Sequence, residues 1–404
     1  MHIKPVDRMQ KYDRLYDRFG VRSMARDTAH TKRAVDGILD LVHAAADEIE
    51  RSRRLPDAVV AALRDTGINR LLIPAALGGM QAPITDVMDV MERIAAVDGS
   101  AGWCAAIGAG GNVFAGYMPA TGASTVFADP DQSSATMFAP VGRVVSDHGR
   151  AILSGRWPFT SNCLHSTWVG LGALFHEADG VDPVPRIVFV PAADLTIEDT
   201  WDVVGLRGTG SHHVAATEVP VYPDRCTRFA DRPWPDGTLW RLPIYTTLLP
   251  TLVAVPLGIA RGAVDEVSRQ AREGRTARRG QLADAPISMA ELAVADTRLR
   301  AARAGLRDAV GEAHTRAERG EPISRQLQAR ICLAGMHACD TSVEVASTAH
   351  QLGGGAAAYR GSHLLRALSD VQAARQHLLF SHQHLSELGK LVAGLDMAYP
   401  PYVM

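Results

Sequence analysis

The stretch MFAPVGRVVSDHGRAILSGRWPFTSNCLHSTWVGLGAL, from Met137 to Leu174, separates two helical parts of the chain. Its short runs of β-branched and aromatic residues are divided by Gly, Pro, Asp and Asn, a pattern that predicts strands joined by turns. Runs of the same kind continue toward the end of residues 133–232. This region is therefore expected to form a small antiparallel barrel or sandwich.

The segments on both sides have helical patterns. In residues 27–132, apolar residues recur at helical spacing with charged residues between them. In residues 233–404 the patterns are longer, and one apolar stripe follows a single helix face: Leu292, Ala295, Leu299, Ala302, Leu306 and Val310. Helices of this length commonly pack as an antiparallel bundle. The sequence thus predicts a mainly α protein with a central β domain, divided into domains 27–132, 133–232 and 233–404.

Composition limits the possible functions. The 404 residues are 47% hydrophobic and 21% charged with a formal net charge of -2, which is ordinary for a soluble globular protein and offers no basic surface to nucleic acid or an anionic membrane. Residues 1–33 hold no apolar segment, and no run is long enough to cross a bilayer. The five cysteines have no zinc-type spacing, so neither a disulfide framework nor a metal is expected. We predict a cytoplasmic protein.

The residues from Ser154 to Trp168 combine rings and hydroxyls. If the strand continues through them, Trp157, Phe159 and Ser161 share one face. One interpretation is an ordinary strand and turn whose tryptophans fill the core. The other is the wall of a pocket for a flat, polar-edged ligand such as a flavin, whose faces need stacking partners and whose edge needs hydrogen bonds.

Two glycine-rich segments are candidates for close backbone approach. GLRGTGSHH, from Gly205 to His213, can bind phosphate through backbone N–H groups or form a plain turn. It matches neither a P-loop nor the G-x-G-x-x-G fingerprint of dinucleotide-binding folds. Nearer the C-terminus, Gly353, Gly354 and Gly355 interrupt a helical pattern.

The segment after these glycines carries charged and imidazole groups. Arg366 and Asp370 have the i,i+4 spacing of a helix ion pair, and His377 lies seven residues further on, close to the same face. The spacing of His377, His382 and His384 does not place all three on one helix face, so we predict no metal site there.

Three segments together resemble one family. They are the stretch quoted first, WDVVGLRGTGSHHV, and LLRALSDVQAARQH. They are similar to motifs of the acyl-CoA dehydrogenase superfamily and, within it, of the group D flavin-dependent monooxygenases. The resemblance covers about residues 30–395. It implies an N-terminal helical domain, a β domain and a C-terminal four-helix bundle.

The resemblance also implies site residues. It implies that the flavin ring is touched by Phe138, Ala139, Trp157, Phe159 and Ser161. It implies that Gly353, Gly354 and Gly355, with an arginine near Arg278, reach the flavin of a neighbouring subunit, and that Trp103 and Asn112 face the substrate cavity. Close helix packing is the alternative for the last two. Asn162 departs from the family, which usually has glycine at this position.

The two branches of the superfamily differ in a catalytic base. Acyl-CoA dehydrogenases need a glutamate to remove a proton next to the thioester carbonyl, and the family places it in one of two segments. Neither the first segment, 375–380, nor the second, 241–264, contains a carboxylate here. The absence argues against dehydrogenation. His377 instead fits the oxygenase branch, either as a proton acceptor or as a hydrogen-bond donor to a peroxide.

We therefore predict a flavin-dependent monooxygenase that hydroxylates an aromatic or heteroaromatic substrate through a flavin hydroperoxide. Molecular oxygen is the co-substrate, and a separate reductase supplies reduced FAD or FMN, because the chain has no nicotinamide-binding fingerprint. The family implies a homotetramer. The alternatives are an N-oxygenase of an amino sugar or amine, an acyl-CoA dehydrogenase with a displaced base, and a non-catalytic flavin-binding protein.

Overall fold

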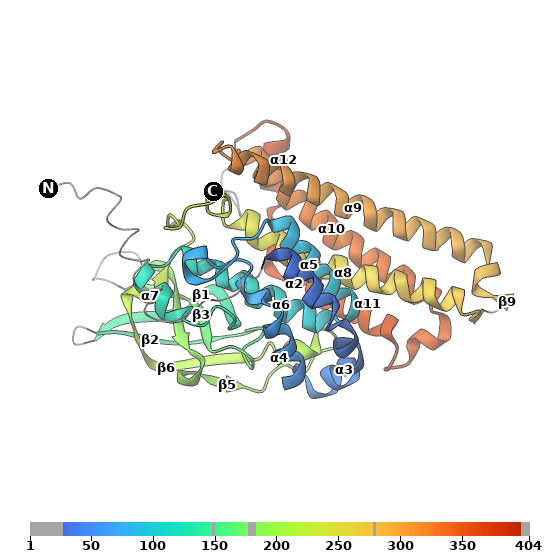
Figure 1. Cartoon of the computed structure of the whole chain (residues 1–404), viewed down its shortest axis with the longest axis horizontal. Helices are drawn as coiled ribbons and strands as arrows, with labels where there is room; N and C mark the ends of the chain where they lie inside the picture. The colour runs from blue at the N-terminus through green and yellow to red at the C-terminus, as the bar shows by residue number, and fades with distance from the viewer. Residues whose placement is uncertain (1–26, 148–149, 177–182, 278–279, 397–404) are drawn as a thin grey trace.

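The computed structural model describes residues 27–147, 150–176, 183–277 and 280–396. Its elements follow the expected order of helices, sheet and helices (Figure 1). The N-terminal helices are α2 (Thr28–Asp36), α3 (Leu39–Ser52), α4 (Asp57–Asp65), α5 (Ile84–Val97), α6 (Gly99–Gly111) and α7 (Ala120–Val126). The mainly helical fold with a central β domain is thus confirmed.

The β domain is one sheet of seven strands in the order β5-β6-β2-β1-β3-β4-β7. The strands are β1 (Ser134–Asp147), β2 (Arg150–Trp157), β3 (Trp168–His176), β4 (Val184–Pro191), β5 (Thr196–Glu198), β6 (His213–Val221) and β7 (Cys226–Thr227). The sheet is mixed, because β1 and β3 run parallel while the other pairs are antiparallel. The expectation of a purely antiparallel sheet was wrong at this pair.

The parallel pair follows from the chain path. Strand β2 returns beside β1, pairing Arg150 with Asp147 and Ser154 with Arg143, and ends at Trp157. The turn over residues 158–167 then crosses to the other side of β1, so β3 begins opposite Ser134 and runs in the direction of β1. This crossing turn carries Phe159 and Ser161, and it places both at one end of the sheet.

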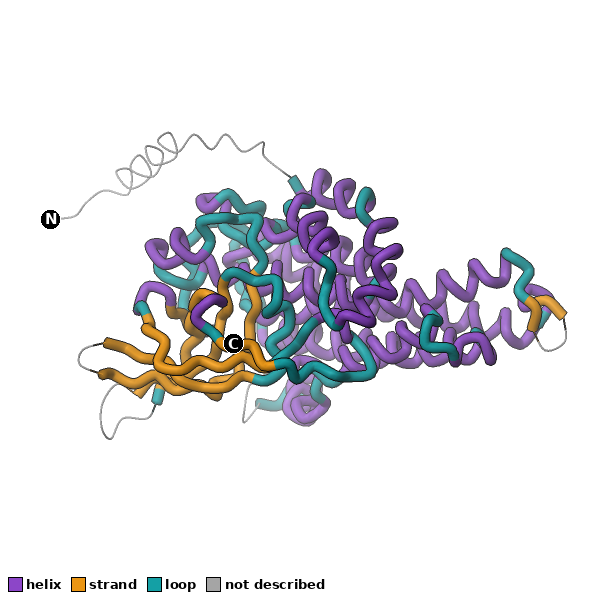
Figure 2. Tube along the Cα trace, turned by 90° about the horizontal axis from the view of Figure 1, so that it is seen from below, coloured by secondary structure: helices purple, strands orange, loops and turns teal. Residues whose placement is uncertain are grey.

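The C-terminal part is a helical bundle that projects away from the sheet (Figure 2). It contains α8 (Tyr245–Arg272), α9 (Pro286–Glu318), α10 (Arg325–Leu352), α11 (His363–Arg375) and the short α12 (Leu385–Val392). Two short strands, β8 (Thr276–Ala277) and β9 (Gly280–Gln281), lie at the far end of the bundle between α8 and α9 (Figure 1). Helix α8 is long and apolar enough to cross a membrane, but 94% of its apolar window is buried. It is therefore the core helix of the bundle.

Two hydrophobic cores hold these parts. One is enclosed by the strands around Trp157, and the other is continuous from the N-terminal helices into the bundle, where α5 and α8 pack together. A shared core means that the N-terminal helices and the bundle stabilise each other. The domain limits at 132 and 232 stay predictions.

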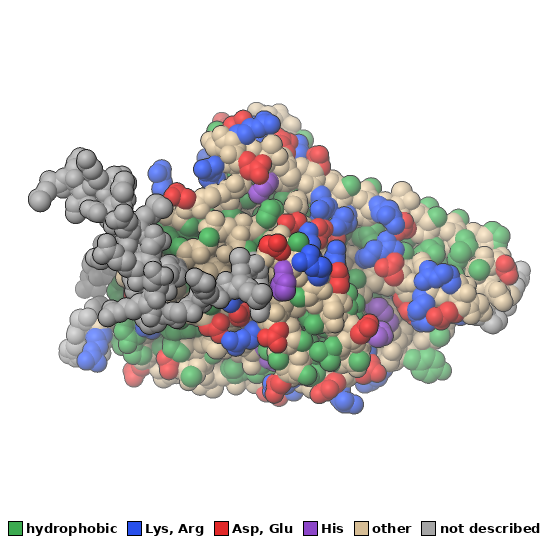
Figure 3. All heavy atoms as spheres, viewed as in Figure 1, with side chains coloured by type: hydrophobic (Ala, Val, Ile, Leu, Met, Phe, Trp, Pro, Cys, Tyr) green, Lys and Arg blue, Asp and Glu red, His purple; other side chains and the backbone are tan. Residues whose placement is uncertain are grey.

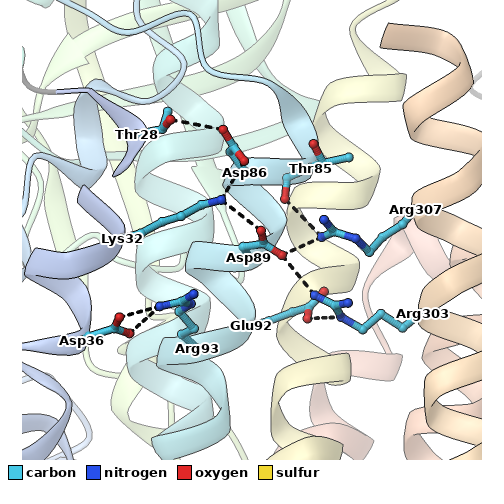
Figure 4. Close-up of polar contacts among 10 residues, drawn as sticks. All are labelled: Thr28, Lys32, Asp36, Thr85, Asp86, Asp89, Glu92, Arg93, Arg303 and Arg307. Atoms are coloured by element: carbon cyan, nitrogen blue, oxygen red, sulfur yellow. Dashed lines mark hydrogen bonds and ion pairs between the residues drawn. The ribbon is translucent and has the colours of Figure 1, made fainter. Parts of the chain in front are cut away.

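An ion-pair network joins α2, α5 and α9 at the surface of this shared core (Figure 4). Asp89 on α5 accepts from Lys32 at 3.0 Å and Arg307 at 2.6 Å, and also from Arg303 at 3.0 Å. Glu92, one helix turn further on, pairs with Arg303 at 2.5 Å. Positive and negative side chains alternate over this face of the molecule (Figure 3). The network thus fastens the first helices of the chain to the bundle.

Candidate active site

Three side chains from the three parts of the fold meet at one point. Trp103 lies on α6, Ser161 on the turn between β2 and β3, and His377 just after α11. The indole Nε1–H of Trp103 donates to Ser161 Oγ at 3.1 Å. The imidazole of His377 packs edge-on against the Trp103 ring, with 5.5 Å between ring centroids and 67° between planes. The structure therefore brings together three of the predicted site residues.

His377 is held as a neutral imidazole. Burial lowers its pKa to about 4, so the ring is uncharged at neutral pH. Its Nδ1 accepts the backbone N–H of Leu379 at 3.3 Å, and its ring packs on Phe380. A neutral ring whose Nδ1 accepts carries its proton on Nε2. Within the described residues no partner for Nε2 is present, so this N–H remains available to a ligand.

Ser161 begins a row of three hydroxyl groups. Its Oγ lies 2.7 Å from Ser211 Oγ, which lies 2.7 Å from Thr209 Oγ1. Thr209 in turn donates to the carbonyl oxygen of Leu206 at 2.7 Å. We call Ser161, Ser211 and Thr209 the hydroxyl row. Sequence reasoning missed Ser211 and Thr209, although the GTGS letters of their segment were the available signal.

The segment that holds Ser211 and Thr209 is anchored to helices on both sides. The N–H of Leu206 donates to Asp370 Oδ1 at 2.5 Å, and the N–H of Gly208 donates to Ser100 Oγ at 3.1 Å. Gly208 lies so close to α3 and α6 that a Cβ there would sit 2.0 Å from a methyl group of Ile49. The glycines of this segment thus serve close packing, and these two N–H groups are not available to a phosphate.

Asp370 is the buried end of this anchor. Its side chain is 2% exposed, and burial, reinforced by the nearby charge of Asp98, raises its pKa well above the usual carboxyl range. The expected pair between Arg366 and Asp370 is not formed. Arg366 donates to Asp47 at 2.5 Å instead, because Asp370 turns inward to the backbone of Leu206.

Two aromatic residues of the opening stretch, Trp157 and Phe159, lie in different surroundings. Strand β2 ends at Trp157, so the alternation that would place Trp157, Phe159 and Ser161 on one face does not continue, and that prediction was wrong. Trp157 is fully enclosed in the sheet core and donates to the carbonyl of Gly172 at 2.7 Å. Phe159 is 63% exposed, has a φ of 60° and lies edge-on to Trp201. Of the two rings, only Phe159 offers a face to a ligand.

The predicted residue Asn112 has hydrogen-bond partners within the fold. Asn112 is fully buried, where its amide donates to the carbonyls of Asn69 and Gln132 and its Oδ1 accepts from Ser134. A side chain with all these bonds holds the end of α6 to the start of β1. These bonds favour the alternative of close packing, and the place of Asn112 in the substrate pocket stays a prediction.

Phe138 and Ala139 lie at an irregularity of β1, between Met137 and Gly142. The Phe138 ring packs edge-on against Phe114 and Phe229. Both residues are partly buried, and their contact with a flavin stays a prediction.

The remaining candidates lie in the bundle. Gly353 ends α10 and is buried, while Gly354 and Gly355 are exposed, and Gly354 has a φ of 58°. Arg275 approaches Gly354, since a Cβ there would lie 3.1 Å from its guanidinium. Arg278 lies outside the described residues. Their predicted contact with a second subunit's flavin stays a prediction. In the described part of the chain, no group of three or more His, Cys, Asp or Glu side chains is placed to hold a metal.

Comparison with known proteins fits this architecture. Residues 27–124 match the family model described as acyl-CoA dehydrogenase, N-terminal domain, and residues 251–382 match acyl-CoA dehydrogenase, C-terminal domain. An indole-3-acetate monooxygenase of Pseudomonas putida is 31% identical over 363 residues, which cover 89% of this chain and 92% of the relative. The oxygenase subunit HsaA of a flavin-dependent monooxygenase from Rhodococcus jostii is 30% identical, with 85% and 92% covered.

Solved structures agree with these relatives. The crystal structure of the 3-HSA hydroxylase from Rhodococcus sp. RHA1 superposes with a TM-score of 0.85 at 27% identity, covering 92% of this chain and 98% of that chain. XiaF from Streptomyces sp., in complex with FADH2 and glycerol, gives 0.86 at 25% identity, covering 98% and 99%. The chain thus belongs to the acyl-CoA dehydrogenase superfamily, among its flavin-dependent monooxygenases.

Proposed function

We propose that the protein hydroxylates an aromatic or heteroaromatic ring of the phenol or indole type, with reduced flavin and molecular oxygen as co-substrates. The observation that carries this proposal is the meeting of neutral His377, Trp103 and Ser161 at one point between the three parts of the fold. The relative that acts on indole-3-acetate supports the choice of an aromatic substrate.

The residues around this point fit a flavin ring. Phe159 is a bulky residue with positive φ and an exposed ring, a strained arrangement that is typical of functional positions. It would stack on the flavin while Ser161 binds the polar edge. When bound, reduced flavin supplies the electrons that activate oxygen. Trp157 is enclosed in the sheet core, at the end of the strand that leads to this turn.

His377 acts in this proposal as a hydrogen-bond donor. Because Leu379 N–H occupies Nδ1, the neutral ring presents Nε2–H to whatever lies in front of it. Accepting a proton at Nε2 would require the other tautomer and would leave Leu379 N–H opposite a second N–H. The donor role is therefore favoured over the role of a base.

The dehydrogenase alternative finds no support in the site. Helix α8 provides no carboxylate over residues 245–264, and the one acid close to the site on α11, Asp370, is committed to the backbone of Leu206. The proposal further includes a separate flavin reductase, a homotetramer in which Gly353, Gly354 and Gly355 approach a partner's flavin, and a cytoplasmic location.

The test is rapid mixing of protein and reduced flavin with oxygenated buffer, with phenols and indoles as substrates. His377→Ala should keep flavin binding but lose at least about tenfold in product formed per flavin oxidised, since a positioned donor or proton-transfer group contributes on this scale or more. His377→Gln, whose amide can donate, should recover part of the loss. His30→Ala, on the exposed start of α2, is the matched control. Full coupling in His377→Ala, or no aromatic product from the wild type, would contradict the proposal.

A further inference from the structure

In the hydroxyl row, the direction in which one hydroxyl donates its hydrogen bond depends on the other two. Ser161, Ser211 and Thr209 are all buried, and consecutive oxygens lie 2.7 Å apart. Each hydroxyl carries one proton, so each can donate only one hydrogen bond at a time. Ser211 therefore cannot donate to both neighbours, and if it accepted from both, its own buried proton would have no acceptor among the described residues. The direction of donation is thus the same along the whole row.

Two directions are possible. In the first, Ser161 donates to Ser211, Ser211 to Thr209, and Thr209 to the carbonyl of Leu206. Ser161 then accepts only from Trp103, so one lone pair on its oxygen remains for a ligand.

In the second direction, Thr209 donates to Ser211 and Ser211 donates to Ser161. Trp103 and Ser211 then fill both lone pairs of the Ser161 oxygen, and its proton is left for a ligand. Ser161 is thus a hydrogen-bond acceptor in the first direction and a donor in the second.

We propose that the hydroxyl row is a reversible switch that matches Ser161 to both redox forms of the flavin. Reduced flavin has N–H groups where oxidised flavin has bare ring nitrogens. Ser161 would accept from such an N–H in the first direction and donate to the bare nitrogen in the second. Ser211 and Thr209 are positioning residues that act through Ser161, and the inference rests on the proposed function.

Reversing the direction of donation costs little free energy, because no group of the row is left without a hydrogen-bond partner. When Thr209 turns away from the Leu206 carbonyl, that oxygen keeps the indole N–H of Trp201 at 2.9 Å. The first direction gains one neutral hydrogen bond, which corresponds to about a two- to tenfold preference for reduced flavin.

Thr209→Val separates the two directions. Valine has the shape of threonine but cannot accept from Ser211, so Ser211 donates to Ser161 and fixes Ser161 as a donor. We expect the dissociation constant of reduced FAD divided by that of oxidised FAD to rise about tenfold. Such a change lowers the two-electron potential of the bound flavin by about 30 mV.

Matched variants test the mechanism. Thr209→Ser keeps the hydroxyl and should leave the ratio unchanged. Thr209→Val with Ser211→Ala frees a lone pair of Ser161, so the ratio should return to within about threefold of wild type. In a Ser161→Ala background, Thr209→Val should have no effect on the ratio. The measurement is anaerobic titration with dithionite-reduced FAD and with oxidised FAD, repeated with FMN.

The outcomes separate the two proposals. If wild type binds both forms of FAD and Thr209→Val leaves the ratio of the two dissociation constants unchanged, the switch is wrong and the flavin site stands. If wild type binds neither FAD nor FMN in either form, the proposed function fails and the switch fails with it. If circular dichroism shows Thr209→Val unfolded, Thr209→Ala removes the same hydroxyl and carries the same expectation.

Discussion

The protonation state of Asp370 should be visible in the stability of the protein. This carboxyl is almost completely buried, and burial together with the charge of Asp98 raises its pKa well above the usual range. In the unfolded chain its pKa returns to about 3.9. Between the two values the folded chain holds a proton that the unfolded chain releases. The free energy of unfolding therefore falls as pH rises through this window.

Asp370→Asn removes the titrating group and keeps the contact. The asparagine Oδ1 can still accept the N–H of Leu206, which donates to Asp370 at 2.5 Å. Each pH unit inside the window lowers the stability of the wild type by up to about 1.4 kcal/mol, and the variant has no such loss. Above about pH 4 the variant should therefore gain on wild type by up to about 1.4 kcal/mol for each pH unit that lies inside the window.

The assay is urea unfolding at pH 5, 6 and 7, followed by circular dichroism. Asp65→Asn, at the exposed end of α4, is the control and should run parallel to wild type. The comparison uses the difference in free energy of unfolding between Asp370→Asn and wild type, and asks how this difference changes with pH. A difference that is the same at every pH reports only how well the amide fits the site. Parallel curves for these two proteins would refute the raised pKa.

Three other changes test separate parts of the structure. Burial opposes ionisation of Asp89, but the hydrogen bond from Lys32 and the charge of Arg307 outweigh it, so its pKa is lowered. Asp89→Asn should cost about 1–3 kcal/mol at pH 7, and the difference from wild type should fade only as pH falls below about 4, because the depressed pKa holds the stabilising charge above that range. Asn112→Ala should cost about 2–3 kcal/mol in urea unfolding, because three buried partners lose their hydrogen bonds; an unchanged midpoint would show that the amide is dispensable. Phe159→Gly should leave stability equal or raise it by up to about 1 kcal/mol, because glycine accepts the positive φ, while flavin binding weakens at least tenfold; unchanged flavin affinity would remove Phe159 from the site.

Most of the fold could be predicted from the periodic spacing of apolar residues. The apolar stripe from Leu292 to Val310 predicts a helix that the structure extends over Pro286–Glu318, and the apolar runs around 137–174 correspond to strands. These patterns succeed because each depends on neighbours within one element. The direction of β3 could not be predicted in this way, because it depends on the side of β1 to which the chain crosses.

The site was less accessible to sequence reasoning because its geometry depends on long-range partners. Arg366 and Asp370 have the spacing of a pair, yet Asp47 and the backbone of Leu206, distant in sequence, bind them instead. Asn112 is a polar residue at the end of an apolar helix, and only the structure shows that three partners within the fold already satisfy it. Composition cannot distinguish a satisfied polar side chain from one that awaits a ligand.

The segment after Gly205 explains how three parts of the fold form one site. A Cβ at Gly205 would lie 2.0 Å from the carbonyl oxygen of Ser369, so the chain passes directly against α11 at this point. Asp370 fixes the next N–H, and His377 follows seven residues later on the same segment. The hydroxyl row and the imidazole are thus fixed to one helix, although they come from different parts of the fold. Burial raises the pKa of Asp370 at this contact, because a charge buried there is costly without a partner.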